Sequence, residues 1–597
     1  MMKHTTSQRF GRVLAIGVLC FAPGIASAIW PELGRPVSTA PGNQDVPKIA
    51  SDGAGGAIIT WQDLDNPTVN IFAQHVRVTG ELDAAWPING RLLLTDPLAL
   101  AGASEGQASP AIVTDGAGGA IVAWADGRSS VTQTDIFAQH VLASGAVDLA
   151  WPANGTGLSV IAGIQHTPAI VSDGAGGAIV TWVDGRPGAS KVDVYAQHVL
   201  ASGRVDARWP VNGLAVSTAP GAQGFPAIVG DGAGGAIITW DDSRTATSGV
   251  DIFAQHVLNA GVVDPAWPVN GRALCLAASD QFDPTIVSDG ARGAIVTWQD
   301  ARDGVNDIYA QRVLGSGAIA PGWPVNGRAV CTAPLEQIHP ILTADGASGA
   351  IVTWLDLRNG RNHNPFAQHV LASGAIDAAW PVNGRALSLS ARDEVSASIV
   401  ADTAGGAIIS WEEDFRVFAQ RIRASGLLDP TFPVNGREVR PVLTVQRAPD
   451  LVPDGVGNAI VAWSDLAPVS TSDIFAMQVL SGCDGASGPL PAEVDNSVRA
   501  SKSGSAAVLA WNVAAGVIAS DVLRGQVRSL PVGSGGADEQ CLADDSAIDT
   551  FADRELPAAG DAFWYLIRVT NACGRGPYGF EEIHGITAAQ RVSATCP

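Results

Sequence analysis

The fold is decided by residues 168–184, which read PAIVSDGAGGAIVTWVD. An apolar run from Pro168 to Ser172 is followed by Asp-Gly-Ala-Gly-Gly and by a second apolar run from Ala178 to Trp182. Glycines accept positive φ angles and Asp bonds a turn backbone, so the centre predicts a tight hairpin turn. The second run is apolar at every position, which predicts a strand covered on both faces.

Copies of this unit follow one another along residues 45–480. Each copy continues with a third run, such as residues 192–200, and most continue with a Trp-Pro-x-Asn-Gly turn and a fourth run, such as residues 214–217. No copy has a helical period. A four-stranded sheet with two apolar faces must stack on its neighbours, which predicts an all-β propeller. The strand tryptophan recurs about every 57 residues, in the range of propeller blades or somewhat above: Trp61, Trp124, Trp182, Trp240, Trp298, Trp354, Trp411 and Trp463.

The two ends of the array predict a closed ring. The eighth unit has its third run, residues 473–480, but no Trp-Pro-x-Asn-Gly and no fourth run. The missing piece stands before the first unit, from Trp30 to Ser38. An N-terminal strand that completes the last blade removes a free edge, so we expect an eight-bladed propeller over residues 29–481.

Residues 1–28 have the features of a secretory signal peptide. Lys3, Arg9 and Arg12 precede a short apolar segment, residues 13–22, and Ala26-Ser27-Ala28 forms a small-residue cleavage site. The apolar segment is too short to span a bilayer as a helix, and no other segment could do so; an uncleaved anchor is the alternative. We expect a secreted protein, extracellular or at the cell surface, with the periplasm as the alternative.

The charge balance bears on partners. Lys and Arg number 36 against 58 Asp and Glu, a formal net charge of −22. Phosphates repel such a surface, which argues against nucleic acid and anionic membranes as partners.

The repeat stops after Ser481. Residues 482–488 are a small-residue linker, and residues 489–597 predict a β-sandwich. The strand 565–571 alternates apolar and polar residues, and Trp511 closes an earlier apolar run. This segment resembles fibronectin type III domains, with Trp511 at the place of their early core tryptophan.

Six cysteines follow the predicted signal peptide, and their full pairing cannot be read from spacing. Cys573 directly follows a predicted strand, and export favours disulfides, so we expect a bond between Cys541 and Cys573. Cys275 and Cys331 hold the same position in successive units, and we expect two buried free thiols there. The state of Cys483 and Cys596 stays open.

The repeat itself resembles secreted bacterial proteins with tandem Asp-Gly-x-Gly-Gly-Ala-Ile … Trp-x-Asp units. The resemblance covers most of the chain. It implies the propeller fold and an exported location, and it implies no activity.

A carboxylate stands two residues after each strand tryptophan, and an Arg often follows it. Because nearly every blade has this pair, we interpret it as a turn cap and ion pair; a ring that binds cations or sugars is the alternative. The acids are Asp63, Asp126, Asp184, Asp242, Asp300, Asp356, Glu413 and Asp465.

A histidine after Ala-Gln occupies one slot of the third run in five units: His75, His140, His198, His256 and His369. Arg312 and Arg421 replace it in two others, so the slot predicts a strand-packing or ion-pair position rather than a general base. We expect no cofactor, with Ca²⁺ in the Asp-Gly-x-Gly-Gly turns as the alternative.

Enzymatic features are sparse. A sialidase needs a nucleophilic Tyr among arginines, and the four tyrosines, Tyr195, Tyr309, Tyr565 and Tyr578, do not suit that role. Residues 102–106 read Gly-Ala-Ser-Glu-Gly but lack the helix that a hydrolase elbow requires. A non-enzymatic protein is therefore the main expectation.

Variable loops are the expected place for a ligand, because loops on a rigid scaffold can change without cost to the fold. We predict a binding protein that recognises a protein or glycan through these loops. The alternative is a secreted carbohydrate-active hydrolase or lyase, which a clustered pair of carboxylates in a pocket would favour. The candidate ligand residues are Arg361, His363, His339, Glu412, Glu413 and Asp414.

Overall fold

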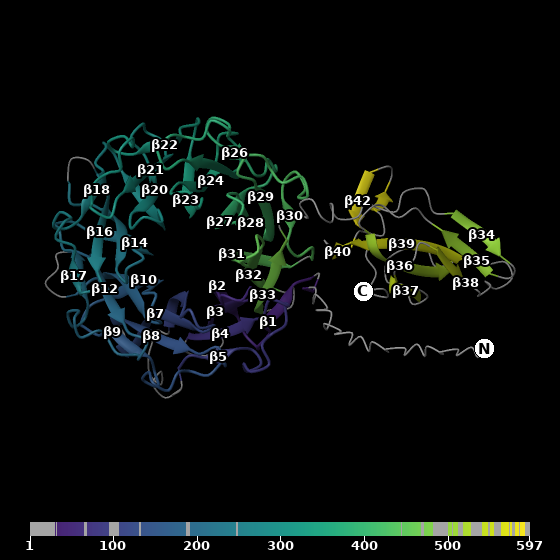
Figure 1. Ribbon diagram of the computed structural model, residues 1–597, viewed down its shortest axis with the longest axis horizontal. Helices are drawn as coiled ribbons and strands as arrows, with labels where there is room; N and C mark the ends of the chain where they lie inside the picture. Colours follow the sequence, from purple (N-terminus) through teal and green to yellow (C-terminus); the bar gives the residue numbers. More distant parts are fainter. Residues whose placement is uncertain are drawn as a thin grey trace, which may run out of the picture.

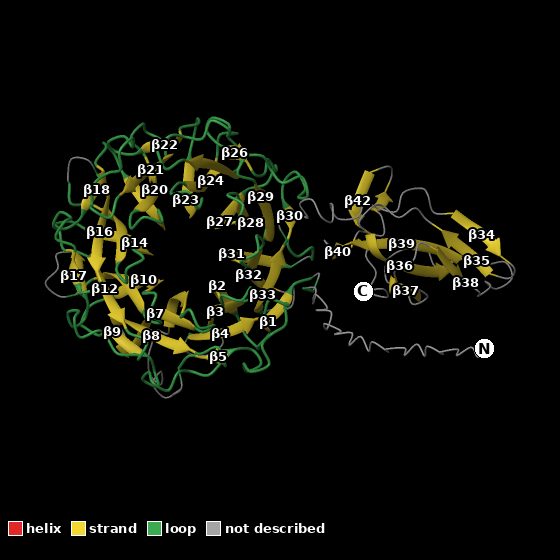
Figure 2. Cartoon of the chain, viewed as in Figure 1, coloured by secondary structure: helices red, strands yellow, loops and turns green. Residues whose placement is uncertain are grey.

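The computed structural model describes residues 30–480, apart from residues 32, 65–68, 95–106, 131–132, 187–190, 246–248, 443 and 467–470. Beyond them it describes only the backbone of strands between residues 499 and 590. The predicted signal peptide and linker, and the side chains of Cys541 and Cys573, lie outside this description. Every regular element within it is a β-strand (Figure 2). None of these residues forms a helix long and apolar enough to cross a membrane.

Eight antiparallel sheets, seven of four strands and one of five, surround a common axis, which confirms the eight-bladed propeller (Figure 1). The inner strands are β2 (Gln44–Ser51), β6 (Gln107–Thr114), β10 (Gln165–Ser172), β14 (Gln223–Gly230), β19 (Gln281–Ser288), β23 (Gln337–Ala344), β27 (Glu394–Ala401) and β31 (Val445–Pro453). The second strands, which carry the tryptophans, are β3 (Ala57–Asp63), β7 (Ala120–Ser130), β11 (Ala178–Asp184), β15 (Ala236–Asp242), β20 (Ala294–Asp300), β24 (Ala350–Asp356), β28 (Ala407–Glu413) and β32 (Ala459–Leu466).

The third strands are β4 (Asn70–Val76), β8 (Gln133–Val141), β12 (Asp193–Val199), β16 (Asp251–Leu258), β21 (Asp307–Val313), β25 (Asn364–Val370), β29 (Arg416–Ile422) and β33 (Ser472–Val479). The outer strands are short: β5 (Arg91–Leu92), β9 (Thr156–Ser159), β13 (Leu214–Ser217), β18 (Arg272–Cys275), β22 (Arg328–Cys331), β26 (Arg385–Ala386), β30 (Arg437–Glu438) and β1 (Arg35–Ser38). A further two-residue strand, β17 (Val262–Val263), pairs with β16.

The N-terminal strand closes the ring, as predicted. β1 pairs antiparallel with β33, so the eighth sheet has the order β1-β33-β32-β31 (Figure 1). Trp30 is buried, and its Nε1 donates to the carbonyl of Val78 in the first blade at 3.1 Å. The closure therefore joins strands from opposite ends of the array.

The repeated tryptophans form the core between blades. All eight are fully buried. Trp182 stacks on Tyr195 of the neighbouring strand, with ring centroids 6.5 Å apart. Its Nε1 donates to Asp184 at 2.8 Å, and Arg186 donates to the same carboxylate at 2.7 and 2.9 Å. In the blades that share this arrangement, the acid after the tryptophan thus stabilises the fold by accepting hydrogen bonds from the indole and from the arginine.

The inner strands are longer than predicted. β10 begins at Gln165 rather than Pro168, and its register shifts between His166 and Ala169. The same β-bulge occurs in each blade. A proline follows the bulged residue in seven of the eight blades, and proline within a sheet is confined to edges and bulges.

Strands also fill the C-terminal part. One sheet has β34 (Arg499–Ser503), β35 (Ala506–Ala510) and β38 (Thr550–Asp553). A second has β37 (Gln540–Ser546), β36 (Val517–Gln526), β39 (Phe563–Asn571) and β40 (Gly574–Arg575), and a hairpin joins β41 (Phe580–Ile583) to β42 (Ile586–Gln590). The likeness to fibronectin type III domains stays a prediction.

Cys275 and Cys331 are buried free thiols, as predicted. Each lies beside the Arg of the next blade, with Arg302 at 3.3 Å from the sulfur of Cys275. Burial raises the pKa of both thiols to about 12, so they stay protonated.

Candidate functional site

Two different faces result from the strand register. In the third blade, Gln165 at the start of the inner strand lies opposite Asp184, which in turn lies opposite Asp193. The loops from second to third strand and the connections between blades therefore share one face, here called the loop face. The Asp-Gly-x-Gly-Gly turns lie on the opposite face, the turn face.

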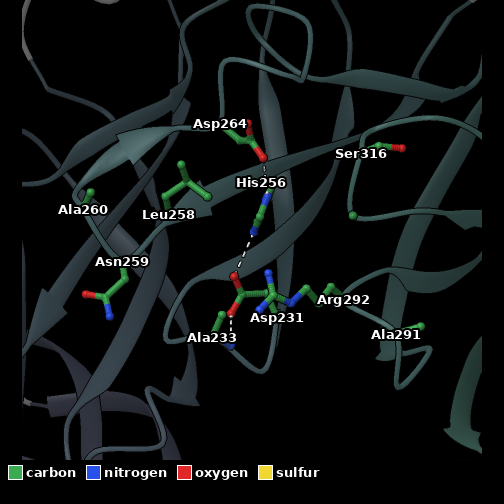
Figure 3. A pocket seen from close by; sticks show the side chains of 11 residues that line it. Asp231, Ala233, His256, Leu258, Asn259, Ala260, Asp264, Ala291, Arg292 and Ser316 are labelled. Atoms are coloured by element: carbon green, nitrogen blue, oxygen red, sulfur yellow. Dashed lines mark hydrogen bonds and ion pairs between the residues drawn. The ribbon is translucent and has the colours of Figure 1, made fainter.

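The turn face is built from the histidine slots. His256 lies between two carboxylates, with Nδ1 2.8 Å from Asp264 and Nε2 3.0 Å from Asp231 (Figure 3). These residues line a pocket of about 540 Å³ together with Arg292. Four other blades repeat the same clamp at 2.9–3.1 Å. The histidine of this slot thus contacts two carboxylates of its own blade, and we assign the pocket to the scaffold.

The loop face carries a ring of residues that differ from blade to blade. In every blade the bulge of the inner strand holds one non-glycine residue at a φ between 47° and 59°. Bulges re-aim side chains, so one repeated backbone feature presents eight side chains of seven residue types. They are Val46, Ser109, Thr167, Phe225, Asp283, His339, Ser396 and Ala448.

Blade 4 differs from the other blades at the residue before the bulge, which is Gly224 and lies opposite Asp241 of β15. A Cβ added at Gly224 would lie 2.8 Å from Oδ1 of Asp241, so a larger residue would make this carboxyl move. Gly224 and Asp241 belong to a pocket of about 390 Å³, whose lining also includes His166, Thr167, Phe225, Asp280 and Phe282. We call it the blade 3–5 pocket.

Asp241 differs from an ordinary surface carboxyl. Burial, together with the charges of Asp283 and Asp242, raises its pKa to about 6, against the opposing backbone hydrogen bond from Gly224. Phe225 is 64% exposed beside it. An exposed aromatic ring and a partly buried acid thus meet at one opening.

Asp283, the bulge residue of blade 5, links two blades. Its Oδ2 accepts a hydrogen bond from Gln299 Nε2 at 2.8 Å and lies 3.1 Å from Nδ1 of His339. The carboxylate of Asp283 raises the pKa of His339, against burial. His339, one of the predicted ligand residues, is therefore an exposed bulge residue next to the blade 3–5 pocket.

The other predicted ligand residues form a second group at the junction of blades 6 and 7. Arg361 is exposed, and Nδ1 of His363 lies 3.1 Å from Asp393. Asp414 is exposed and pairs with Arg392, whereas Glu413 is buried and accepts from Ser390 Oγ at 2.8 Å.

Glu412 is separate from this group. It is buried on the side of β31, and burial raises its pKa against a hydrogen bond from the backbone of Ala448. The structure therefore divides the six predicted residues among three places on the blades rather than one.

A buried carboxyl pair at the same junction was missed by sequence reasoning. Glu394, the first residue of β27, lies opposite Glu413 at the end of β28. Burial raises the pKa of Glu394 to about 8, and the charge of Glu413 adds to the effect, against hydrogen bonds from Ser388 and Asn364. The available signal was Glu394 itself, since the other blades have Gln at this position.

Among the described residues, no group of three or more His, Cys, Asp or Glu is arranged to hold a metal ion.

Comparisons with known proteins bear on the architecture. No protein-family model matches the sequence, and no curated protein matches it. A Dyadobacter fermentans protein of unknown function is similar in structure, with 8% identity over 53% of this chain and 94% of its own, at a TM-score of 0.33.

Two further solved structures are similar over about half of this chain. The α-L-arabinanase of Penicillium chrysogenum, complexed with arabinobiose, has 12% identity over 52% of this chain and 93% of its own, at a TM-score of 0.32. The α-L-arabinofuranosidase of Fusarium graminearum, complexed with an iminosugar inhibitor, has 12% identity over 53% and 92%, at a TM-score of 0.28.

Proposed function

We propose that this protein is exported and binds a carbohydrate in the blade 3–5 pocket of its loop face. The observation that carries the proposal is the blade 3–5 pocket itself, in which Gly224 lies opposite Asp241 and the exposed ring of Phe225 lies beside them. The exposed ring of Phe225 suits the apolar face of a sugar, and the carboxyls of Asp241 and Asp280 can accept its hydroxyl groups. A protein ligand is the alternative outcome.

The experiment is a glycan-binding screen on the purified chain, followed by titration with the best ligand. Phe225→Ala combined with Phe282→Ala should weaken binding at least tenfold, because both rings line the pocket. Phe415→Ala is the matched control, since Phe415 is an exposed ring on the loop face of blade 7. Equal binding by all three proteins would place the ligand elsewhere.

Carbohydrate hydrolysis is the second candidate function, and Asp241 favours it. With a pKa of about 6, Asp241 retains a proton at mildly acidic pH and can donate it, while the Asp283 carboxylate lies in a polar setting next to it. Glycoside hydrolysis commonly uses two carboxyl groups in such different environments. If sugar release is found with the screened glycans, Asp241→Asn should abolish release and leave binding within about threefold.

Three further features are proposals that rest on the sequence. The first is export after cleavage before Ile29, which N-terminal sequencing of the secreted protein would test. The second is the fibronectin-like sandwich of residues 489–597. The third is the Cys541–Cys573 bond, which peptide mapping under non-reducing conditions would test. Two sheets of three and four strands support the sandwich. Arg361, His363 and Asp414 stay proposals as further ligand contacts.

A further inference from the structure

Blade 7 departs from the repeat at two buried positions of the loop face. In the other blades a glutamine of the inner strand lies opposite an aspartate, as Gln337 lies opposite Asp356 in blade 6. Blade 7 has Glu394 opposite Glu413. Glu394 is fully buried and Glu413 is 8% exposed, so two potential negative charges replace one.

The compensating arginine is also missing. In six blades a guanidinium contacts the aspartate, as Arg358 does with Asp356 at 2.6 Å. The corresponding residue of blade 7 is Phe415. Arg416 lies opposite Glu413 in the strand register, but its guanidinium contacts Glu438 at 3.3 Å, and Arg392 contacts Asp414. The structure shows no basic side chain in contact with Glu394 or Glu413 among its described residues.

The hydrogen bonds of the pair leave one buried oxygen of Glu394 without a donor. Oε2 of Glu394 accepts a hydrogen bond from Asn364 Nδ2 of blade 6 at 2.7 Å, whereas its buried Oε1 has no hydrogen-bond partner. Ser390 Oγ donates to Oε1 of Glu413 at 2.8 Å. Trp411 Nε1 is also without a partner, so Glu413 does not turn back to the indole as the aspartates of other blades do.

If both carboxyl groups are ionised, they need a positive charge between them, because burial of uncompensated charge is costly. The oxygen atoms around such a charge are the four carboxylate oxygens and the hydroxyls of Ser388 and Ser390, beside the amide donor of Asn364. Hard divalent cations prefer such ligands, and Ca²⁺ tolerates an irregular set completed by water.

We propose that Glu394 and Glu413 bind one Ca²⁺ ion at the junction of blades 6 and 7. The ion takes the place of the guanidinium that other blades use at this position. The site also connects β27 to the loop of blade 6, because Glu394 of β27 accepts a hydrogen bond from Asn364. The side chain of Asn364 is held in turn by Asn359, whose Nδ2 donates to Oδ1 of Asn364 at 2.8 Å. This site is separate from the blade 3–5 pocket, so its existence does not depend on the proposed carbohydrate function.

The test is calcium titration of the chelator-treated full chain at pH 7.5, by calorimetry and by thermal unfolding. Wild-type protein should bind Ca²⁺ and melt several degrees higher in its presence, because a ligand of the native state stabilises it. Glu394→Gln should lose at least tenfold in Ca²⁺ affinity and lose the calcium-dependent shift. This variant restores the glutamine of the other blades, so the fold accepts it.

Asp414→Asn is the matched control, because Asp414 adjoins Glu413 in sequence but is exposed and paired with Arg392. It should respond to Ca²⁺ as wild type does. The proposal is overturned if wild-type protein shows no calcium response, or if Glu394→Gln responds as strongly as wild type. A melting temperature that rises in Glu394→Gln with no Ca²⁺ binding by wild type would also overturn it, since the pair then shares a proton.

Discussion

At the scale of single residues, the side chains in the histidine slots of the turn face lie against carboxylates. His198 has Nδ1 3.0 Å from Asp206 and Nε2 2.9 Å from Asp173. Arg421 stands in the same slot and contacts both Asp402 and Asp429, whereas Arg312 contacts Asp289 and has Ala320 at the place of the second aspartate. The slot therefore accepts a side chain that contacts the aspartate of the Asp-Gly-x-Gly-Gly turn, and histidine itself is not required.

This interpretation predicts unequal effects of two substitutions. His198→Arg should change the free energy of unfolding by less than about 1 kcal/mol, because the chain itself uses Arg in this slot. His198→Leu removes the side-chain partner of buried Asp173 and leaves Asp206 with Arg208 alone, which should cost about 3–5 kcal/mol. Urea unfolding of both variants measures the difference, and equal losses would contradict this interpretation.

The pH dependence of stability follows from carboxyl groups shifted in opposite directions. Against burial, hydrogen bonds from Arg77, the Ala85 N–H and His75 lower the pKa of Asp83 to about 2. Its contribution to stability is present above the unfolded value near 3.8 and is lost as the pH falls toward 2. Burial, aided by neighbouring acids, raises the pKa of Asp193 and Asp307 to about 6. Their contribution is full below 3.8 and is lost as the pH rises through 6.

We therefore expect the highest melting temperature between about pH 4 and pH 6, with lower values on both sides. Calorimetric scans from pH 2 to pH 8 at constant ionic strength test this window. A melting temperature that rises steadily to pH 8 would show that the raised pKa values of Asp193 and Asp307 do not govern stability.

The sequence identifies scaffold residues better than site residues, for a physical reason. A residue that every blade needs recurs eight times, so Asp184 and His198 are recognisable from the chain alone. Gly224 and Asp241 become meaningful only as a cross-strand pair, and that pairing depends on a bulge that shifts the register. Their juxtaposition could not be read from spacing.

At the scale of elements, the hairpin and the doubly covered strand were predictable because each follows from local chemistry. The Asp-Gly-Ala-Gly-Gly turn and the all-apolar run fix β10 and β11 at their shared end. The start of β10 was predicted wrongly, at Pro168 rather than at Gln165. In a single copy of the repeat, a proline that begins a strand cannot be told from a proline that follows a bulge within the strand.

The buried tryptophan gives a quantitative prediction at this scale. Trp240 is fully buried, stacks on Phe253 and donates from Nε1 to Asp242 at 2.8 Å. Trp240→Ala should cost about 3–5 kcal/mol through lost burial and a cavity. Denaturant unfolding followed by circular dichroism measures the loss. Substitution of the exposed Val211 by Ala is the control and should have little effect.

At the scale of the whole molecule, stability depends on a contact between the two ends of the repeat array. β1 supplies the outer strand of the eighth blade, and Arg35 Nε donates to the carbonyl of Gly80 in the first blade at 2.7 Å.

Deleting residues 29–40 removes β1 and Trp30 but leaves β2 intact. The edge of β33 is then unpaired and the junction between the first and last blades loses its cover, which exposes a strand to aggregation. We expect aggregation, or a melting temperature lower by about 10 °C or more. A chain that begins at Trp30 retains every one of these contacts and is the matched control. Thermal unfolding and light scattering of the two chains decide the question, because a melting profile that the deletion leaves unchanged would mean that the ring does not need its N-terminal strand.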